Sequence, residues 1–136
     1  MGNLRMCLAL IDIDHLKTIN DECGHAVGDA VLSRFADSCS QQLYSNDKPG
    51  RYGGEEFLLI MPGSDLTRIP LVFTRLHEAI LLMQVFGLLP GKSLTFSMGA
   101  VGVTGPADHL EKLIRRADDA LYRAKQSGRD RFELGK

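Results

Sequence analysis

The stretch MCLALIDID, residues Met6 to Asp14, decides how this chain folds. It is a nearly continuous apolar run that ends in alternating acids, a pattern typical of a buried strand whose last residues emerge from the core. Side chains two residues apart in a strand share a face, so we expect Asp12 and Asp14 on the same side of the sheet. The stretch therefore predicts a sheet with carboxylates at one end.

The other predicted elements all follow this strand in the sequence. A polar segment that ends at Gly24 precedes a stretch in which apolar residues recur at helical spacing. Strands are predicted for RY and FLLIMPG on either side of two glycines, for SLTFSMGAVGV from Ser93, and for RFEL near the C-terminus. Two amphipathic helices separate them: one that Asp65 could cap, and one behind a capping-box pattern of Asp108 and Glu111.

The resulting order, β-α-α-β-β-α-β-α-β, predicts an α/β sandwich with helices on one face of a mixed, mainly antiparallel sheet. A length of 136 residues with 44% apolar and 24% charged residues fits one domain over residues 1–136. The net charge of -1 provides no general attraction to nucleic acid. Three cysteines without C-x-x-C spacing argue against a disulfide framework or a zinc site and favour a reducing cytoplasm.

The hairpin sequence RYGGEEF, Arg51 to Phe57, holds the most informative chemistry. Two adjacent glycines suit a tight turn, and on their own they indicate nothing more. They also leave room for a phosphate chain to approach the backbone, and Glu55 and Glu56 follow at once. Acids at a hairpin tip are usually solvated, but Asp12 could lie beside them. Such a group could hold Mg²⁺, which takes carboxylate oxygens together with substrate phosphates.

Four segments from Cys7 onward share an order and spacing with a known family: DIDHLKTINDECGHAVGD, RYGGEEF, TFSMGA and RRADDALYRAKQSGRDRF. They resemble the GGDEF family, the diguanylate cyclases, in its GGEEF form. The resemblance implies a nucleotide-cyclase, palm-like fold. It also implies a reaction in which two GTP molecules, one on each of two facing domains, become cyclic di-GMP with loss of two pyrophosphates. The implied cofactors are two Mg²⁺ or Mn²⁺ ions per active site, and the implied catalytic unit is a homodimer.

The resemblance also implies roles for single residues. Asp12 and the backbone carbonyl of Ile13 correspond to metal ligands. Glu55 corresponds to a residue that contacts metal and helps to deprotonate the attacking ribose 3′ hydroxyl, and Glu56 to a second catalytic acid. The residues implied in substrate binding are Asn20 and Asp29 for guanine, Gly53 and Gly54 for the approach of the phosphates, and Lys125, Arg129 and Lys17 for the triphosphate. Without the resemblance, Lys125 and Arg129 would be explained as cations that oppose a helix dipole.

Two departures from the family pattern bear on function. The stretch YSND, Tyr44 to Asp47, aligns with a product-binding site that pairs an arginine with an acid. Tyr44 replaces the arginine and removes a bidentate donor for phosphate, while Arg75 resembles a second arginine that supports this site. We therefore predict that product does not inhibit through this surface, and that Tyr44→Arg restores affinity.

The second departure is that the chain starts almost at its first strand, without the segment that usually opens the domain. This suggests a truncated domain whose parent carries an N-terminal sensory or membrane region. The domain itself is expected in the cytoplasm, even where the parent protein is membrane-anchored. The alternative function is a catalytically impaired domain that binds GTP or cyclic di-GMP and regulates a neighbour.

Overall fold

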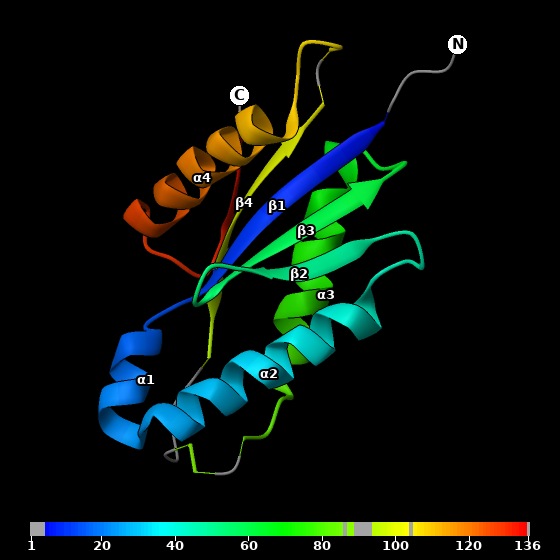
Figure 1. The fold of residues 1–136 in the computed structure, drawn as a ribbon. Helices are drawn as coiled ribbons and strands as arrows, with labels where there is room; N and C mark the ends of the chain where they lie inside the picture. Colours follow the sequence, from blue (N-terminus) through cyan, green and yellow to red (C-terminus); the bar gives the residue numbers. More distant parts are fainter. Residues whose placement is uncertain (1–4, 86, 89–93, 104, 136) are drawn as a thin grey trace.

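The computed structural model describes residues 5–85, 87–88, 94–103 and 105–135 (Figure 1). The elements in chain order are β1 (Met6–Ile13), α1 (Leu16–Cys23), α2 (His25–Gln42), β2 (Lys48–Tyr52), β3 (Glu56–Pro62), the 3-10 helix η1 (Leu66–Arg68), α3 (Ile69–Leu81), β4 (Phe96–Gly102), α4 (Leu110–Gln126) and β5 (Phe132–Leu134). This confirms the predicted order and adds η1. Ser93, the first residue of the predicted fourth strand, lies outside the described residues.

The five strands form one sheet in the order β2-β3-β1-β4-β5. All neighbouring strands run antiparallel except β4 and β5, which are parallel. The prediction of a mixed, mainly antiparallel sheet is therefore confirmed. The apolar run at the start of the chain is the middle strand, and its residues are buried from Cys7 to Ile13.

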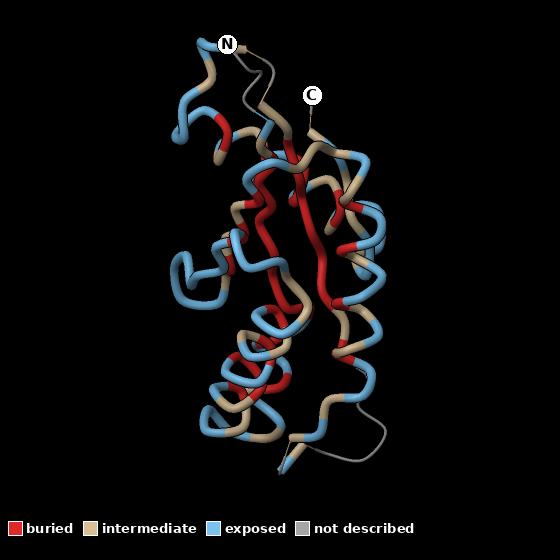
Figure 2. Tube along the Cα trace, turned by 90° about the vertical axis from the view of Figure 1, so that its right-hand side faces the viewer, coloured by how far each residue is buried: buried red, intermediate tan, exposed pale blue. Residues whose placement is uncertain are grey.

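Helices lie on both faces of this sheet, so the prediction that they share one face is wrong (Figure 1). The odd-numbered residues of β1 pack into the larger core cluster with α1, α2 and α3, whereas Leu8 and Leu10 pack against α4. The physical reason is that β1 is apolar on both sides, and side chains alternate between the faces of a strand. Figure 2 accordingly shows buried residues along the central strands, between more exposed helices.

Contact between backbones brings α4 close to the sheet. A Cβ atom on Gly99 in β4 would lie 2.2 Å from both the carbonyl oxygen of Ala117 and the backbone nitrogen of Leu121. Only a residue without a side chain allows this approach. The last turn of α4 is thereby held over the end of β1 that carries the acids.

The ends of the helices test two capping predictions. Asp65 caps η1 by accepting a hydrogen bond from the backbone nitrogen of Thr67 at 3.0 Å. The prediction that it caps the amphipathic helix α3 is wrong, because Arg68 is the N-cap residue of α3 and makes no side-chain cap. The capping box at Asp108 is wrong, because His109 is the N-cap residue of α4 and makes no side-chain cap. Asp108 instead pairs with Arg116 of α4 at 3.7 Å, two turns into the helix.

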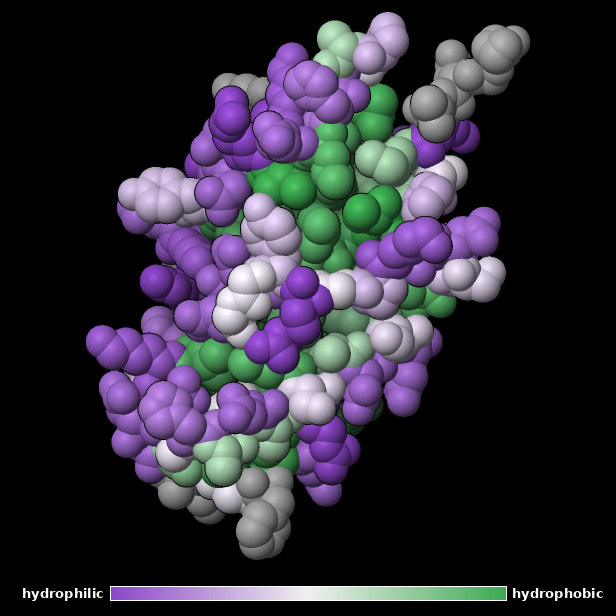
Figure 3. Space-filling model, in the orientation of Figure 1, coloured by the Kyte–Doolittle hydropathy of each residue, from purple (hydrophilic) through white to green (hydrophobic). Residues whose placement is uncertain are grey.

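The face of the sheet that packs against α4 is only partly covered by this helix. Leu58 and Ile60 of β3 are half-buried and pack against the α4 cluster. Figure 3 shows hydrophobic surface over the central strands next to α4. None of the helices within the described residues is long and apolar enough to span a membrane.

Candidate functional site

Asp12 is the centre of the candidate site. It lies in β1 opposite Glu56 of β3 and opposite Ser97 of β4. Residues directly opposite each other in antiparallel strands place their side chains on the same face, so the Asp12 and Glu56 carboxylates are neighbours. The structure therefore brings together two acids that are 44 residues apart in the sequence, since 56 minus 12 is 44.

Lys125 of α4 approaches Asp12 from above this face. Its Nζ donates to Asp12 Oδ2 at 2.5 Å. The other carboxylate oxygen, Oδ1, is buried and has no hydrogen-bond partner among the described residues. A buried acceptor without a partner is costly and is uncommon in folded proteins, so this oxygen indicates a place prepared for a cation or a donor.

The hairpin between β2 and β3 holds the remaining acid at its tip. Gly53 has a φ of 79°, which an L-residue rarely adopts, and Gly54 follows it in the turn. The Arg51 guanidinium donates to the Gly54 carbonyl and lies 5.6 Å from the centroid of the Phe57 ring. Glu55 is exposed at the tip, immediately before Glu56. Its role in catalysis stays a prediction.

Glu56 has a raised pKa. Burial is the largest cause, and the negative charges of Asp12, Asp118 and Glu55 add to it, whereas the positive charge of Lys125 opposes it. Sequence reasoning did not single out Asp118 for this cluster. A signal was available, because Asp118 lies seven residues before Lys125 and therefore on the same side of α4.

These residues could supply only some of the ligands of a divalent cation. No group of three His, Cys, Asp or Glu side chains able to hold a metal occurs within the described residues. Asp12 and Glu56 supply hard oxygen ligands, Ile13 follows Asp12 in the chain, and Asp12 Oδ1 is still unpartnered. Mg²⁺ commonly binds through one or two carboxylates and completes its coordination with substrate phosphates and water. The arrangement suits that mode of binding.

Asp14 does not join this cluster, although it shares the acidic end of the first strand. Its carboxylate accepts hydrogen bonds from Thr95 Oγ1 at 2.6 Å, Ser97 Oγ at 2.7 Å and the Asp130 backbone nitrogen at 3.0 Å. This buried acid therefore anchors the start of β4 and the turn after α4. Arg129 lies in that turn with a φ of 64°. This bracing role could not be predicted from sequence, because it depends on partners more than 80 residues away.

Asn20 lies in α1 and Asp29 in α2, on either side of Gly24, where α1 ends and α2 begins. The Oδ1 atom of Asn20 is buried without a partner among the described residues. It lies against Gly28, where an added Cβ would come within 1.7 Å of it. Asp29 follows Gly28 and is exposed. The sequence did not indicate this close approach of Asn20 to Gly28, and guanine binding by Asn20 and Asp29 stays a prediction.

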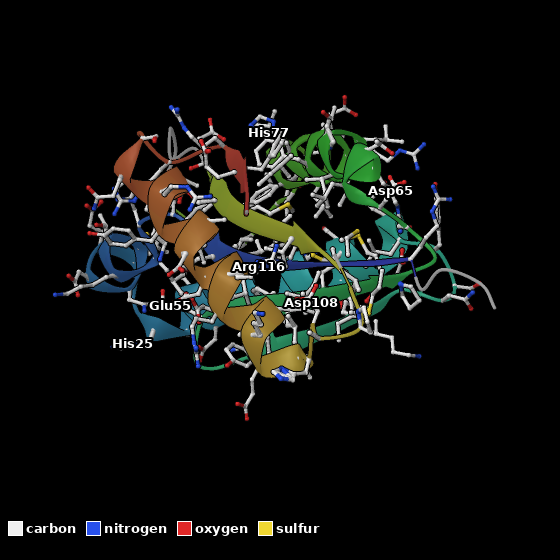
Figure 4. All side chains as sticks on the ribbon, turned by 90° about the horizontal axis from the view of Figure 1, so that it is seen from above. His25, Glu55, Asp65, His77, Asp108 and Arg116 are labelled. Atoms are coloured by element: carbon white, nitrogen blue, oxygen red, sulfur yellow. The ribbon has the colours of Figure 1, made fainter. Side chains whose placement is uncertain are left out.

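Two of the other predicted residues, Glu55 and Lys17, are exposed. Figure 4 shows Glu55 and His25, the first residue of α2, toward the same end of the molecule, with Asp65 at the opposite end. Lys17 is exposed in the first turn of α1, and its contact with phosphates stays a prediction. The structure brings Asp12, Glu56 and Lys125 together directly.

Comparison with known proteins agrees with this arrangement. The family model described as "Diguanylate cyclase, GGDEF domain" matches residues 2–131. The chain is 40% identical over 129 residues to the diguanylate cyclase DgcP of Pseudomonas aeruginosa. This alignment covers 95% of this chain and 19% of DgcP. It is also 40% identical over 133 residues to the response regulator PleD of Caulobacter vibrioides, covering 96% of this chain and 29% of PleD. The chain therefore spans less than a third of the length of these curated relatives.

Solved structures show the same fold. The active GGEEF domain of a diguanylate cyclase from Vibrio cholerae has a TM-score of 0.87 and 26% identity, covering 97% of this chain and 83% of that chain. The GGDEF domain of DgcB from Caulobacter crescentus, in complex with c-di-GMP, has a TM-score of 0.84 and 29% identity. The match covers 96% of this chain and 78% of the DgcB chain. On the match over residues 2–131, this chain belongs to the GGDEF family of diguanylate cyclase domains.

Proposed function

We propose that this domain is a diguanylate cyclase that condenses two GTP molecules into cyclic di-GMP and two pyrophosphates. The observation that carries the proposal is the unpartnered Oδ1 of Asp12, opposite Glu56 and beside Lys125. These residues present oxygen ligands and a cation on one face. That combination suits a nucleoside triphosphate bound with a divalent cation.

In the proposed reaction, each residue of the site has a separate task. Asp12, the Ile13 carbonyl and Glu55 hold Mg²⁺ or Mn²⁺, two ions per site. When bound, the metal acidifies the ribose 3′ hydroxyl and neutralises charge that develops on the phosphates. Glu55 and Glu56 line the place where the 3′ hydroxyl loses its proton. Lys125, Arg129 and Lys17 hold the triphosphate, and the glycine turn at Gly53 and Gly54 admits it.

Base selection is proposed for Asn20 and Asp29. The Asp29 carboxylate accepts hydrogen bonds from the ring N–H and the exocyclic amine of guanine, and the Asn20 amide binds the edge of the base. Adenine would leave the carboxylate facing an acceptor, which costs about 1–3 kcal/mol. GTP is therefore the expected substrate.

The reaction also needs a second copy of the domain. One site binds one GTP, so the attacking hydroxyl and the attacked α-phosphate come from two domains that face each other. A homodimer is the proposed catalytic unit.

The test is to incubate concentrated protein with GTP and Mg²⁺ and to measure cyclic di-GMP and pyrophosphate. We expect both products in a ratio of one to two, none with ATP, and none from Asp12→Asn protein of unchanged thermal stability. GTP binding without product would instead support the alternative, a regulatory domain that has lost turnover. The absence of GTP binding in the presence of Mg²⁺ would contradict the proposed cyclase, and the absence of both GTP and cyclic di-GMP binding would contradict the alternative as well.

A further inference from the structure

The contact between Lys125 and Asp12 raises a question that phosphate binding alone does not answer. The two side chains lie 2.5 Å apart and are only 30% and 11% exposed. A carboxylate withdrawn from water needs a compensating partner, and Lys125 is that partner for Oδ2. A lysine assigned to the triphosphate is therefore already engaged with a proposed metal ligand.

Lys125 also acts on the second acid of the cluster. It is the positive charge that opposes the effects of burial, Asp12, Asp118 and Glu55 on Glu56. A divalent cation bound by Asp12 would meet the ammonium group at the same carboxylate, and like charges at contact distance repel. The lysine has a flexible four-carbon stem, so its charge can move while its backbone stays in α4.

We propose that Lys125 is a placeholder for the cation: it neutralises Asp12 in the empty domain and transfers to the triphosphate when the metal binds. This inference rests on the proposed function. It makes metal and nucleotide binding interdependent, because metal binding releases Lys125 for the phosphates and phosphate binding frees Asp12 for the metal. By linkage, each ligand strengthens the binding of the other to the same extent.

The first test measures Mn²⁺ binding to the nucleotide-free domain by the loss of the free-ion signal in electron paramagnetic resonance. Lys125→Met keeps most of the length of the side chain and removes the charge, so it should tighten Mn²⁺ binding by about fivefold or more, the lower end of usual couplings between sites. Lys112→Met, an exposed change on the same helix, should leave the affinity unchanged. Lys125→Arg keeps a competing cation and should stay close to the wild type. Equal Mn²⁺ affinity in the wild type and Lys125→Met would overturn the proposal.

The second test measures GTP binding by calorimetry with and without metal. In EDTA, Asp12→Asn releases Lys125 and should tighten GTP binding, whereas in Mg²⁺ the same change should weaken it. Glu55→Gln controls for the loss of a nearby negative charge, and it should not show this gain in EDTA. Weaker GTP binding by Asp12→Asn in both conditions would mean that the pair only supports the fold, and the proposal would fail.

Different results would contradict the placeholder role of Lys125 and the proposed cyclase function. Product formation by the wild type, with Mn²⁺ affinity unchanged in Lys125→Met, would remove the placeholder role and leave the proposed function intact. If the wild type neither binds GTP in Mg²⁺ nor forms product, the proposed function fails, whatever the metal titrations show.

Discussion

At the scale of single residues, Glu55 and Glu56 differ in environment although they are adjacent in sequence. Glu55 is exposed at the hairpin tip, whereas Glu56 is half-buried in β3 beside Asp12 and has a raised pKa. A carboxylate with a raised pKa is the better proton acceptor near neutral pH. Glu56 is therefore a stronger candidate for the base than the exposed Glu55, whose proposed contribution is metal binding.

Glu55→Gln tests this division of labour. The change keeps the size of the side chain and removes a metal-binding charge, so we expect turnover to be abolished. Because the residue is exposed in the turn, the melting temperature should stay unchanged. Near-wild-type cyclic di-GMP synthesis by the folded variant would remove Glu55 from the site.

Glu56→Gln should change stability in a pH-dependent way in the metal-free domain. Burial and the neighbouring acids raise the pKa of Glu56 in the folded state, so folding favours its protonated form. The stability that protonation contributes is present below the unfolded-state pKa and is lost as pH rises through the folded-state value. Glutamine cannot ionise, so the variant should melt at a higher temperature than the wild type at neutral pH. The difference should shrink toward about pH 4, near the ordinary glutamate pKa. Parallel melting curves across this range would contradict the expectation.

Gly28→Ala should affect guanine binding through Asn20. The added Cβ would lie 1.7 Å from Asn20 Oδ1, so the amide must move, while the helix backbone tolerates alanine well. We expect GTP binding to weaken by about 1–3 kcal/mol, the cost of a lost polar contact. In a double-mutant cycle, adding Gly28→Ala to Asn20→Ala should cause little further loss. Additive losses would show that Gly28 acts elsewhere.

Residue identity and spacing predicted the candidate site only in part. The acids at Asp12 and Glu56 are confirmed as neighbours, because alternation in a strand and the hairpin sequence are local properties. Local sequence could not show that Asp12 belongs to the candidate site and that Asp14 does not. What distinguishes them is the set of partners, Lys125 for one and Thr95, Ser97 and Asp130 for the other, and these come from distant segments.

Among the helices and strands, α4 determines the position of Lys125, because this helix carries the residue. Helical apolar spacing predicted the helix, and its contact with β4 follows from Gly99 and from the buried residues Ala117, Ala120 and Ala124. Sequence reasoning missed this contact because helical spacing shows which face of a helix is apolar but not which strand that face packs against. It also placed all helices on one face, since an apolar run such as β1 does not show which helix covers which side.

Gly99→Ala should therefore destabilise the domain and disturb the site together. The new Cβ would lie 2.2 Å from backbone atoms of α4, and backbone cannot rotate away as a side chain can. Overpacking of this kind costs about 1–3 kcal/mol, measured by urea unfolding. GTP affinity should also fall, because the helix that carries Lys125 moves.

Gly50→Ala is the matched control for this change. Gly50 is another strand glycine, with no atom within 4 Å of the added Cβ. It should leave both stability and affinity near the wild type. If Gly99→Ala and Gly50→Ala lost equal stability, the close contact of α4 with β4 would not be the cause.

At the scale of the whole molecule, the surface aligned with the family's product site lies away from the Asp12 cluster and is already satisfied internally. Asp47 accepts hydrogen bonds from Arg68 at 2.9 and 2.6 Å and from the Tyr44 backbone nitrogen at 2.7 Å. The centroid of the Tyr44 ring lies 3.7 Å from the Arg68 guanidinium carbon. Burial alone would raise the pKa of Asp47, but the bonds from Arg68 and Tyr44 hold it below the usual value. Arg75, which resembles the second arginine that supports the family's product site, is exposed on α3.

This arrangement changes the expected result of restoring an arginine. Tyr44→Arg alone should leave cyclic di-GMP binding weak, because Arg68 already occupies both oxygens of Asp47 and the new side chain gains no fixed partner. Combining Tyr44→Arg with Arg68→Ala should let the new arginine pair with Asp47 and present its remaining donors to a phosphate. Hydrogen bonds to a charged group contribute roughly 1.5–3 kcal/mol, so calorimetry should show product affinity at least about tenfold higher in the double variant than in either single one.

The wild type itself should not bind product tightly through this surface, and Arg75→Ala tests that without disturbing the buried pair. Arg75 is exposed, so its removal leaves the Asp47–Arg68 contact in place and should not change a weak affinity. Tight product binding by the wild type that is lost in Arg75→Ala would mean that cyclic di-GMP binds beside the closed pair. The internal pairing of Asp47 would then have moved the inhibitory site instead of removing it.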